Sequence, residues 1–247
     1  KVAARVNPPV ETHHLWQIPI KHEGIDHYLI DIVYPNQRYS LFDFKFQAEE
    51  IIKKLLAQNI QPIVAGGTGL YLDALMNNYA SSQKSENLEI KNQLEDQYDI
   101  NGKKFMWDKL NQLAPDEAAR ISPKNYYSVL RALEVLLVTG KPKSQVAQKS
   151  KPFFDYELIL LNPDRKLLYE NIEQRIDEQI EQGLIAETQN LIKQYGTDLP
   201  ALTSLGYKEI GQYLAGELSL AEASSIFKQK TRNYAKRQFT WFRRYAQ

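Results

Sequence analysis

Cysteine is absent from this sequence of 247 residues. Its absence excludes disulfide bonds, thiolate zinc sites and cysteine nucleophiles. No apolar run reaches the roughly 18 residues of a membrane-spanning helix, and the first residues do not resemble a leader peptide. The four histidines lack partners at the spacing of a helical metal site. We therefore expect a soluble, cytoplasmic protein whose chemistry comes from oxygen and nitrogen groups.

The sequence also lacks a strong overall charge, because its formal net charge is only +1. The charge is nevertheless unevenly distributed. Residues 226–247 contain seven basic residues and no acidic one, while the rest of the chain has 24 basic and 30 acidic residues. A basic terminus on an acidic body predicts a phosphate-bearing partner bound at one place. The alternative is a solvated helix face.

Apolar patterns predict an α/β fold. The segments at 27–33, 62–66 and 156–163 read as short buried strands. A helix is expected between Ser40, a possible cap, and Asn59, near its stop. A strand, a helix and a strand with short joins form a crossover unit, which indicates a parallel sheet with helices on its faces. We assign residues 1–80 and 152–247 to this α/β core, with a glycine break at Gly183 in its later helices.

Residues 81–151 lack a strand pattern and predict an inserted helical domain. One of its helices has an apolar face at Val129, Leu133, Leu136 and Leu137, and ends at Gly140 and Pro142. The Gly-Lys pair at 140–141 is not a phosphate loop, because the required earlier glycine and the following Ser or Thr are absent.

The stretch GGTGLY follows the predicted strand at 62–66 directly. Gly66, Gly67 and Gly69 would permit unusual backbone angles and let another group approach closely. Thr68 would present its hydroxyl at the carboxyl end of a parallel strand, where ligands of open sheets bind. A plain tight turn would explain the glycines equally well.

The terminal segment FKQKTRNYAKRQFTWFRR predicts a helix with a cationic face. At 100° per residue, the side chains of Lys228, Arg232, Lys236 and Arg243 share an arc of roughly 80°. An aromatic sector lies beside this arc, and the simplest reading of most of its rings is that they are core. Such cations bind nucleic acid phosphates, and an exposed ring can stack on a base.

Six motifs occur in one order: HYLIDI, YSLFDF, IVAGGTGLY, RALEV followed by TGKP, SLGYKEI, and AKRQFTWFRR. Together they resemble the tRNA dimethylallyltransferases, also called tRNA isopentenyltransferases, over nearly the whole chain. The resemblance implies an α/β, P-loop NTPase-like parallel sheet core with an α-helical insertion. It also implies transfer of a dimethylallyl group from dimethylallyl diphosphate to N6 of adenosine 37 of tRNA, with Mg2+ as cofactor.

The resemblance also implies roles for single residues. Thr68, Arg232 and Lys208 are expected to bind substrate. Contact with the tRNA anticodon stem-loop is expected from Thr68, Lys91, Arg131, Gly206, Tyr207, Lys208, Lys236, Arg237, Gln238, Thr240, Trp241 and Arg243. Ser128 stands where many members have an arginine.

No catalytic residue is assigned, because the family's aspartate and phosphate loop would precede Lys1. We therefore expect little turnover from the chain as given, which we predict to be monomeric. Thr68 and Arg232 are expected to face one shared tunnel. Two alternatives stay open, an RNA-binding module without prenyl transfer and a phosphate-loop small-molecule kinase that binds ATP.

Overall fold

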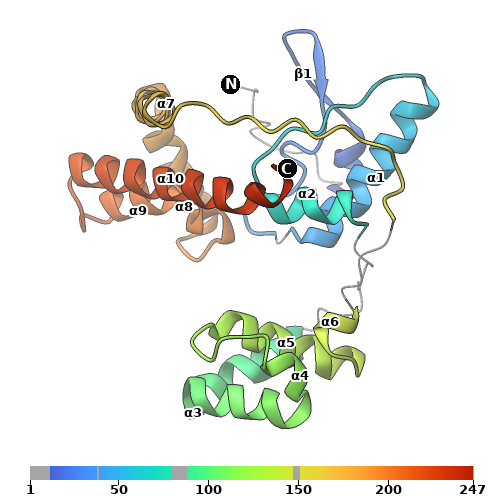
Figure 1. The fold of residues 1–247 in the computed structure, drawn as a ribbon. Coiled ribbons are helices and arrows are strands. Elements are labelled where there is room, and N and C mark those ends of the chain that lie inside the picture. The colour runs from blue at the N-terminus through green and yellow to red at the C-terminus, as the bar shows by residue number, and fades with distance from the viewer. Residues whose placement is uncertain (1–11, 38, 79–87, 147–150, 247) are drawn as a thin grey trace. The chain divides into compact units, whose positions relative to one another are not determined.

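The computed structural model describes residues 12–37, 39–78, 88–146 and 151–246. The chain divides into two compact units, residues 1–72 with 156–247 and residues 73–155 (Figure 1). The predicted border between residues 80 and 81 lies outside the described residues, and the insertion at 81–151 stays a prediction. No helix in the described part of the chain combines the length and the apolar character needed to cross a bilayer.

The first unit contains a short hairpin and most of the helices. Its elements are η1 (Thr12–Gln17), β1 (Ile20–His22), β2 (Ile25–His27), α1 (Leu41–Ala57), the start of α2 (Gly69–Met76), α7 (Arg165–Gln179), η3 (Ile180–Leu184), α8 (Ile185–Tyr195), η4 (Pro200–Thr203), α9 (Tyr207–Leu214), α10 (Leu220–Phe242) and η5 (Arg243–Tyr245). The second unit contains the end of α2, α3 (Leu88–Leu113), α4 (Pro115–Ala118), α5 (Tyr126–Thr139) and α6 (Lys143–Val146).

The sheet seen among the described residues is small and antiparallel. β1 pairs with β2, with Ile20 opposite His27. Their turn, which was not predicted, has a positive φ at Glu23 (51°) and Gly24 (81°), as a two-residue hairpin turn requires. The predicted strand at 27–33 is replaced by bends, since Leu29 and Asp31 have φ values of 61° and 52°.

The other two predicted strands are also not strands in the described structure. Residues 62–66 and 156–163 carry neither helix nor strand, and the second segment runs as an irregular stretch of chain towards α7 (Figure 1). Their apolar side chains are open to solvent, with Ile63 89% exposed, Ile159 74% and Leu161 84%. A strand needs a hydrogen-bonding neighbour. The described residues provide none for these segments.

Helix α1 begins where the sequence predicts it. The Ser40 hydroxyl accepts a hydrogen bond from the Asp43 N–H, and the Asp43 carboxylate accepts one from the Ser40 N–H. This reciprocal cap satisfies two donors that the first helical turn would leave unpaired. Asn59, just past the end of the helix, has a positive φ of 58°. The helix buries Ala48, Ile51 and Ile52, as its spacing predicts.

The second unit has its own hydrophobic core between α3 and α5. Leu94, Met106 and Leu110 of α3 are buried against the α5 residues Val129 and Leu133. Asn125 caps α5, and Gly140 ends it in the left-handed conformation with φ 69°. One predicted core residue is wrong, because Leu137 is 45% exposed. Ala132 and Val135, which the predicted face did not include, are buried instead.

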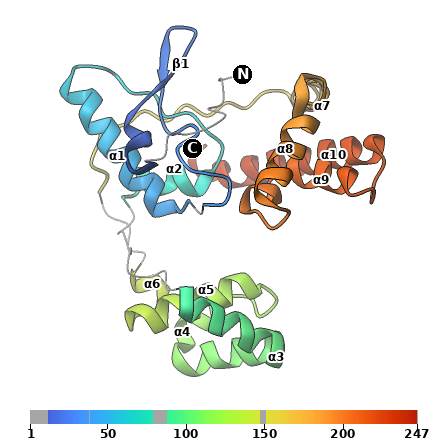
Figure 2. The same ribbon diagram turned by 180° about the vertical axis from the view of Figure 1, so that it is seen from behind.

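The last helices of the first unit pack on one another. Ile172 and Ile176 of α7 form a buried cluster with Phe227 and Ala235 of α10. Helices α7 to α10 lie together in both views (Figure 1, Figure 2). The predicted break at Gly183 is confirmed, since this residue has φ 108° within η3. The long helix α10 is thus held along one side, and its other side faces solvent.

Candidate functional site

The glycine–threonine corner, residues 66–69, joins an irregular segment to α2. The Thr68 carbonyl accepts hydrogen bonds from the N–H groups of Tyr71 (2.9 Å) and Leu72 (3.3 Å), which starts the helix. The Thr68 side chain is exposed. The Gly67 carbonyl accepts a hydrogen bond from Gln238 Nε2 at 3.0 Å. This bond brings the corner against the C-terminal part of α10.

Close packing requires two of the three glycines of the corner, Gly67 and Gly69. A Cβ on Gly67 would lie 1.9 Å from Gln238 Nε2, and one on Gly69 would lie 2.2 Å from Trp241 Cδ1. Gly66 has no atom within 4 Å of such a Cβ. None of the three has a positive φ. The predicted need for unusual backbone angles is therefore wrong, and the predicted close approach is confirmed.

Trp241 lies between the corner and a cation. The Arg244 guanidinium carbon is 4.2 Å from the centroid of the Trp241 ring, and Arg244 Nε donates to the Trp241 carbonyl at 3.0 Å. The indole Nε1 is buried and has no hydrogen-bond acceptor within the described part of the chain. An unpaired buried donor costs about 1–3 kcal/mol. The indole N–H could therefore serve an acceptor that comes from elsewhere.

The cations of α10 fall into two groups that the sequence does not separate. Those in the N-terminal part are paired with carboxylates of α7 and α9. The pairs are Lys228 with Asp177 at 2.6 Å, Lys230 with Glu209 at 2.7 Å, and Arg232 with Glu173 at 2.6 Å. Arg232 also lies over the Tyr169 ring, 5.9 Å from its centroid. These three cations contribute to helix packing.

The second group lies past residue 235, in the last part of α10 and in η5. Its members are exposed, and within the described residues no carboxylate lies at ion-pair distance from them: Lys236, Arg237, Arg243 and Arg244. A positive charge without a protein counter-ion attracts phosphate. This part of the helix is therefore the one suited to bind a polyanion.

A shallow, open hollow of about 540 Å³ lies beside this second group. It is lined by Asn233, Lys236, Arg237, Thr240, Trp241 and Arg244. Four of these residues were predicted to contact tRNA, whereas Asn233 and Arg244 were not. The sequence contained a signal for Arg244, since Lys236, Thr240 and Arg244 follow one another at a spacing of four, which places them on one face of a helix.

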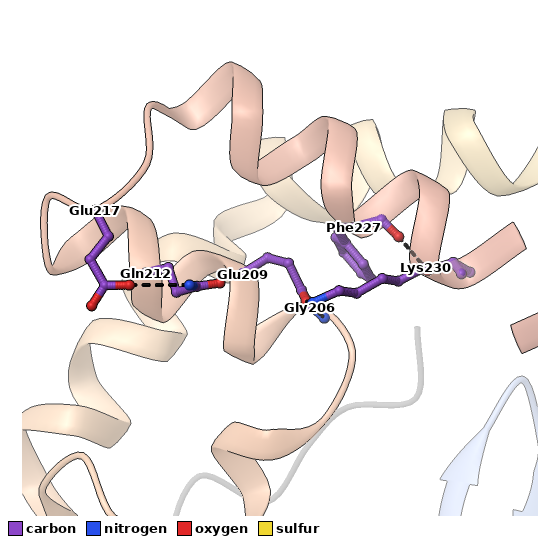
Figure 3. A network of polar contacts seen from close by, with 7 residues as sticks. Gly206, Glu209, Gln212, Glu217, Phe227 and Lys230 are labelled. Carbon is purple, nitrogen blue, oxygen red and sulfur yellow. Dashed lines mark hydrogen bonds and ion pairs between the residues drawn. The ribbon is translucent and has the colours of Figure 1, made fainter. Parts of the chain in front are cut away.

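The predicted element at 206–208 is fixed by a buried carboxylate (Figure 3). Glu209 is 0% exposed and accepts hydrogen bonds from the Gly206 N–H at 2.8 Å and from Lys230 at 2.7 Å. Gly206 has φ 95°, and a Cβ there would lie 2.8 Å from Phe227 Cζ. Glu209 was not predicted, although a carboxylate three residues after the first helix-flanking residue is a capping signal. It ties the start of α9 to α10.

The two other residues of this element face different surroundings. The Tyr207 hydroxyl donates to Glu187 Oε1 at 2.5 Å. Burial, followed by the hydrogen bond to Glu187, raises the pKa of Tyr207 well above its usual range. Tyr207 therefore stays a neutral donor at physiological pH. Lys208, in the first turn of α9, is exposed.

The remaining predicted tRNA contacts lie in the second unit. Arg131 on α5 pairs with Glu134 at 2.7 Å, and Lys91 on α3 lies 3.7 Å from Glu95. Both pairs are local to one helix. The predicted tunnel between Thr68 and Arg232 stays a prediction. Within the described residues, no group of three or more His, Asp or Glu side chains could hold a metal ion.

Comparisons with known proteins agree with one another. A family profile described as IPP transferase matches residues 17–245. The tRNA dimethylallyltransferase of Alkaliphilus oremlandii is 43% identical over 226 residues, which are 90% of this chain and 72% of that protein. The corresponding protein of a Thermoanaerobacter species is 41% identical over 229 residues, which cover 90% of this chain and 73% of that protein.

Solved structures of tRNA isopentenyltransferases and dimethylallyltransferases are also similar to this chain. The full-length tRNA isopentenylpyrophosphate transferase of Bacillus halodurans is 35% identical, with a TM-score of 0.59 over 90% of this chain and 69% of that one. A eukaryotic dimethylallyltransferase acting on tRNA is 26% identical, with a TM-score of 0.72 over 89% of this chain and 56% of that one.

Proposed function

The chain belongs to the IPP transferase family, and from this premise we propose that it transfers the dimethylallyl group of dimethylallyl diphosphate to N6 of adenosine 37 in tRNA. The observation that supports this most is the identity of 43% over 90% of the chain. The site agrees with it, because Gln238 and Trp241, next to the exposed cations of α10, pack directly on the glycine–threonine corner.

We assign the uncompensated cations of α10 and η5 to the RNA backbone. Lys236, Arg237 and Arg244 line one hollow, and phosphate contacts of this kind position a nucleic acid without reading its sequence. The exposed Thr68, at the corner beside them, would face the target adenine. Lys208, Lys91 and Arg131 would add contacts to the anticodon stem-loop.

The reaction itself is a substitution at carbon. The N6–carbon bond forms while the bond between the allylic carbon and the diphosphate oxygen breaks, and the proton of N6 passes to a base. Fixed donors that meet the growing negative charge of the diphosphate lower the barrier. Arg232 is our candidate for this role, in which the diphosphate would take the place of its partner Glu173. We assign the base to no described residue. The described residues do not form a cluster of side chains that could bind Mg2+.

The finer fold assignment is also a proposal. We place residues 62–66 and 156–163 in a parallel sheet of the P-loop NTPase type. The support is their exposed apolar side chains, Ile63, Ile159 and Leu161, which a neighbouring strand and flanking helices would cover. We further propose a monomer that acts in the cytoplasm and requires Mg2+.

A transfer assay tests the function. The protein is incubated with labelled dimethylallyl diphosphate, Mg2+ and anticodon stem-loop RNA. We expect label in RNA with adenosine at position 37 and none in RNA with guanosine there. RNA binding without label would favour the RNA-binding module, and phosphorylation of a small acceptor would favour the kinase. The rate of label transfer tests the prediction of weak turnover.

A further inference from the structure

Three tyrosine rings lie in a row in the second unit. The rings of Tyr98 on α3 and Tyr126 on α5 are stacked, with centroids 4.4 Å apart and planes at 22°. The ring of Tyr127 follows, 4.2 Å from that of Tyr126 and tilted by 45°. Tyr98 packs against the hydrophobic core of the unit. The row is therefore anchored at its inner end, and each of its rings contacts the next.

The outer end of the row is open. Tyr127 is 75% exposed, the largest exposed fraction of any tyrosine among the exposed large side chains of the described chain. A flat, rigid ring with one face in water is the usual platform for an unstacked base, because a planar base can cover it with little loss of side-chain freedom. An isolated surface tyrosine would lack the two supporting rings.

The charges near the platform fit the same ligand. Lys124 is exposed directly before the cap of α5, and Arg131 lies one helical turn after Tyr127. Glu134 holds Arg131 at 2.7 Å, so this cation is partly compensated. Beside the ring, Ser128 stands where the resemblance expects an arginine. Contact with RNA at this place would then rest on stacking more than on charge.

We propose that the exposed face of Tyr127 binds an unpaired base of the RNA substrate by stacking. This inference rests on the proposed function, which makes a tRNA loop the ligand. The proposal concerns binding of the loop and assigns Tyr127 no part in the chemical step. A stacked base adds affinity that depends little on salt, in contrast to a phosphate contact.

Binding of labelled anticodon stem-loop RNA by fluorescence anisotropy tests the platform. We expect Tyr127→Ala to weaken binding about tenfold, and Tyr127→Phe, which keeps the ring, to bind like the parent protein. The slope of affinity against salt concentration should not change in either variant. Tyr127→Leu keeps apolar bulk without a stacking ring and should behave like Tyr127→Ala. The matched control is Phe105→Ala, which removes an exposed aromatic ring on α3 of the same unit.

A second RNA sharpens the test. With abasic nucleotides in the loop, the parent protein and Tyr127→Ala should bind equally, because the base that would be lost is already missing. Parent-like affinity of Tyr127→Ala for the intact loop, or an equal loss with both RNAs, would overturn the platform. If Lys236→Ala still weakens RNA binding in that case, the platform is rejected and the proposed function is retained. Failure of the parent protein to bind the stem-loop would overturn both.

Discussion

Two glycines, Gly67 and Gly69, allow the glycine–threonine corner to pack closely on α10. Gly69 leaves room for the Trp241 ring, and Gly67 leaves room for the Gln238 amide. Since neither Gly67 nor Gly69 has a positive φ, the backbone at both positions is compatible with alanine. Only the neighbouring side chain would clash with the added Cβ. The conflict is therefore one of volume, which makes it simple to test.

We expect Gly69→Ala to lower the free energy of unfolding by about 1–3 kcal/mol, because the new Cβ would force the Trp241 ring out of its place. Gly66→Ala is the control. Open space surrounds its Cβ, so it should leave stability unchanged or raise it slightly. Urea unfolding followed by circular dichroism measures both. Equal stability of the two variants would contradict the packing described for Trp241.

Helix ends are the elements whose position sequence patterns predict best. Ser40 and Asn59 bound α1, and Gly140 ends α5, because capping involves residues close together in the chain. Strands are different, since their hydrogen bonds need a partner from elsewhere. The apolar runs at 62–66 and 156–163 carry the strand pattern, yet nothing in their own residues supplies that partner.

Helix α10 offers a test of such a cap. The Ser219 hydroxyl accepts the Glu222 N–H, and hydrogen bonds from Ser219 lower the pKa of Glu222. A lowered pKa stabilises the fold above the ordinary pKa of the carboxyl, and this contribution is lost as pH falls through the folded-state value. We expect Ser219→Ala to cost about 1 kcal/mol at neutral pH, and the cost to shrink in acid.

Thermal or urea unfolding at pH 7 and near pH 3 provides the measurement. Ser225→Ala serves as the matched control, because it removes an exposed hydroxyl within the same helix and should not destabilise it. A loss of stability in Ser219→Ala that stays constant with pH would speak against the paired cap.

At the scale of the whole molecule, the positive charge that is available to a ligand depends on ion pairs that form only in the folded chain. Helical phase correctly puts Lys228, Arg232 and Lys236 on related faces of α10. It does not reveal that Asp177 and Glu173, more than 50 residues earlier in the chain, compensate the first two. The sequence therefore predicts the cationic helix and the neighbouring residues of the site, while the part that is available to a polyanion becomes clear only from tertiary contacts.

Salt dependence of RNA binding separates the two groups of cations. We expect the double substitution Lys236→Ala and Arg237→Ala to weaken binding and to reduce the slope of log affinity against log salt by about 2, because each side chain would release about one counter-ion. Lys228→Ala should keep the parent slope, since Asp177 already neutralises that lysine. Anisotropy titrations at several salt concentrations measure this. An equal slope change in both proteins would contradict the division of α10.

The hydrogen bond from Gln238 to Gly67 joins residues that are 171 positions apart. During synthesis the glycine–threonine corner leaves the ribosome long before the helix that covers it has been translated. The corner can therefore reach its final packing only after Gln238 and Trp241 have been translated. A stop codon shortly before Gln238 would leave the corner without the side chains that hold it.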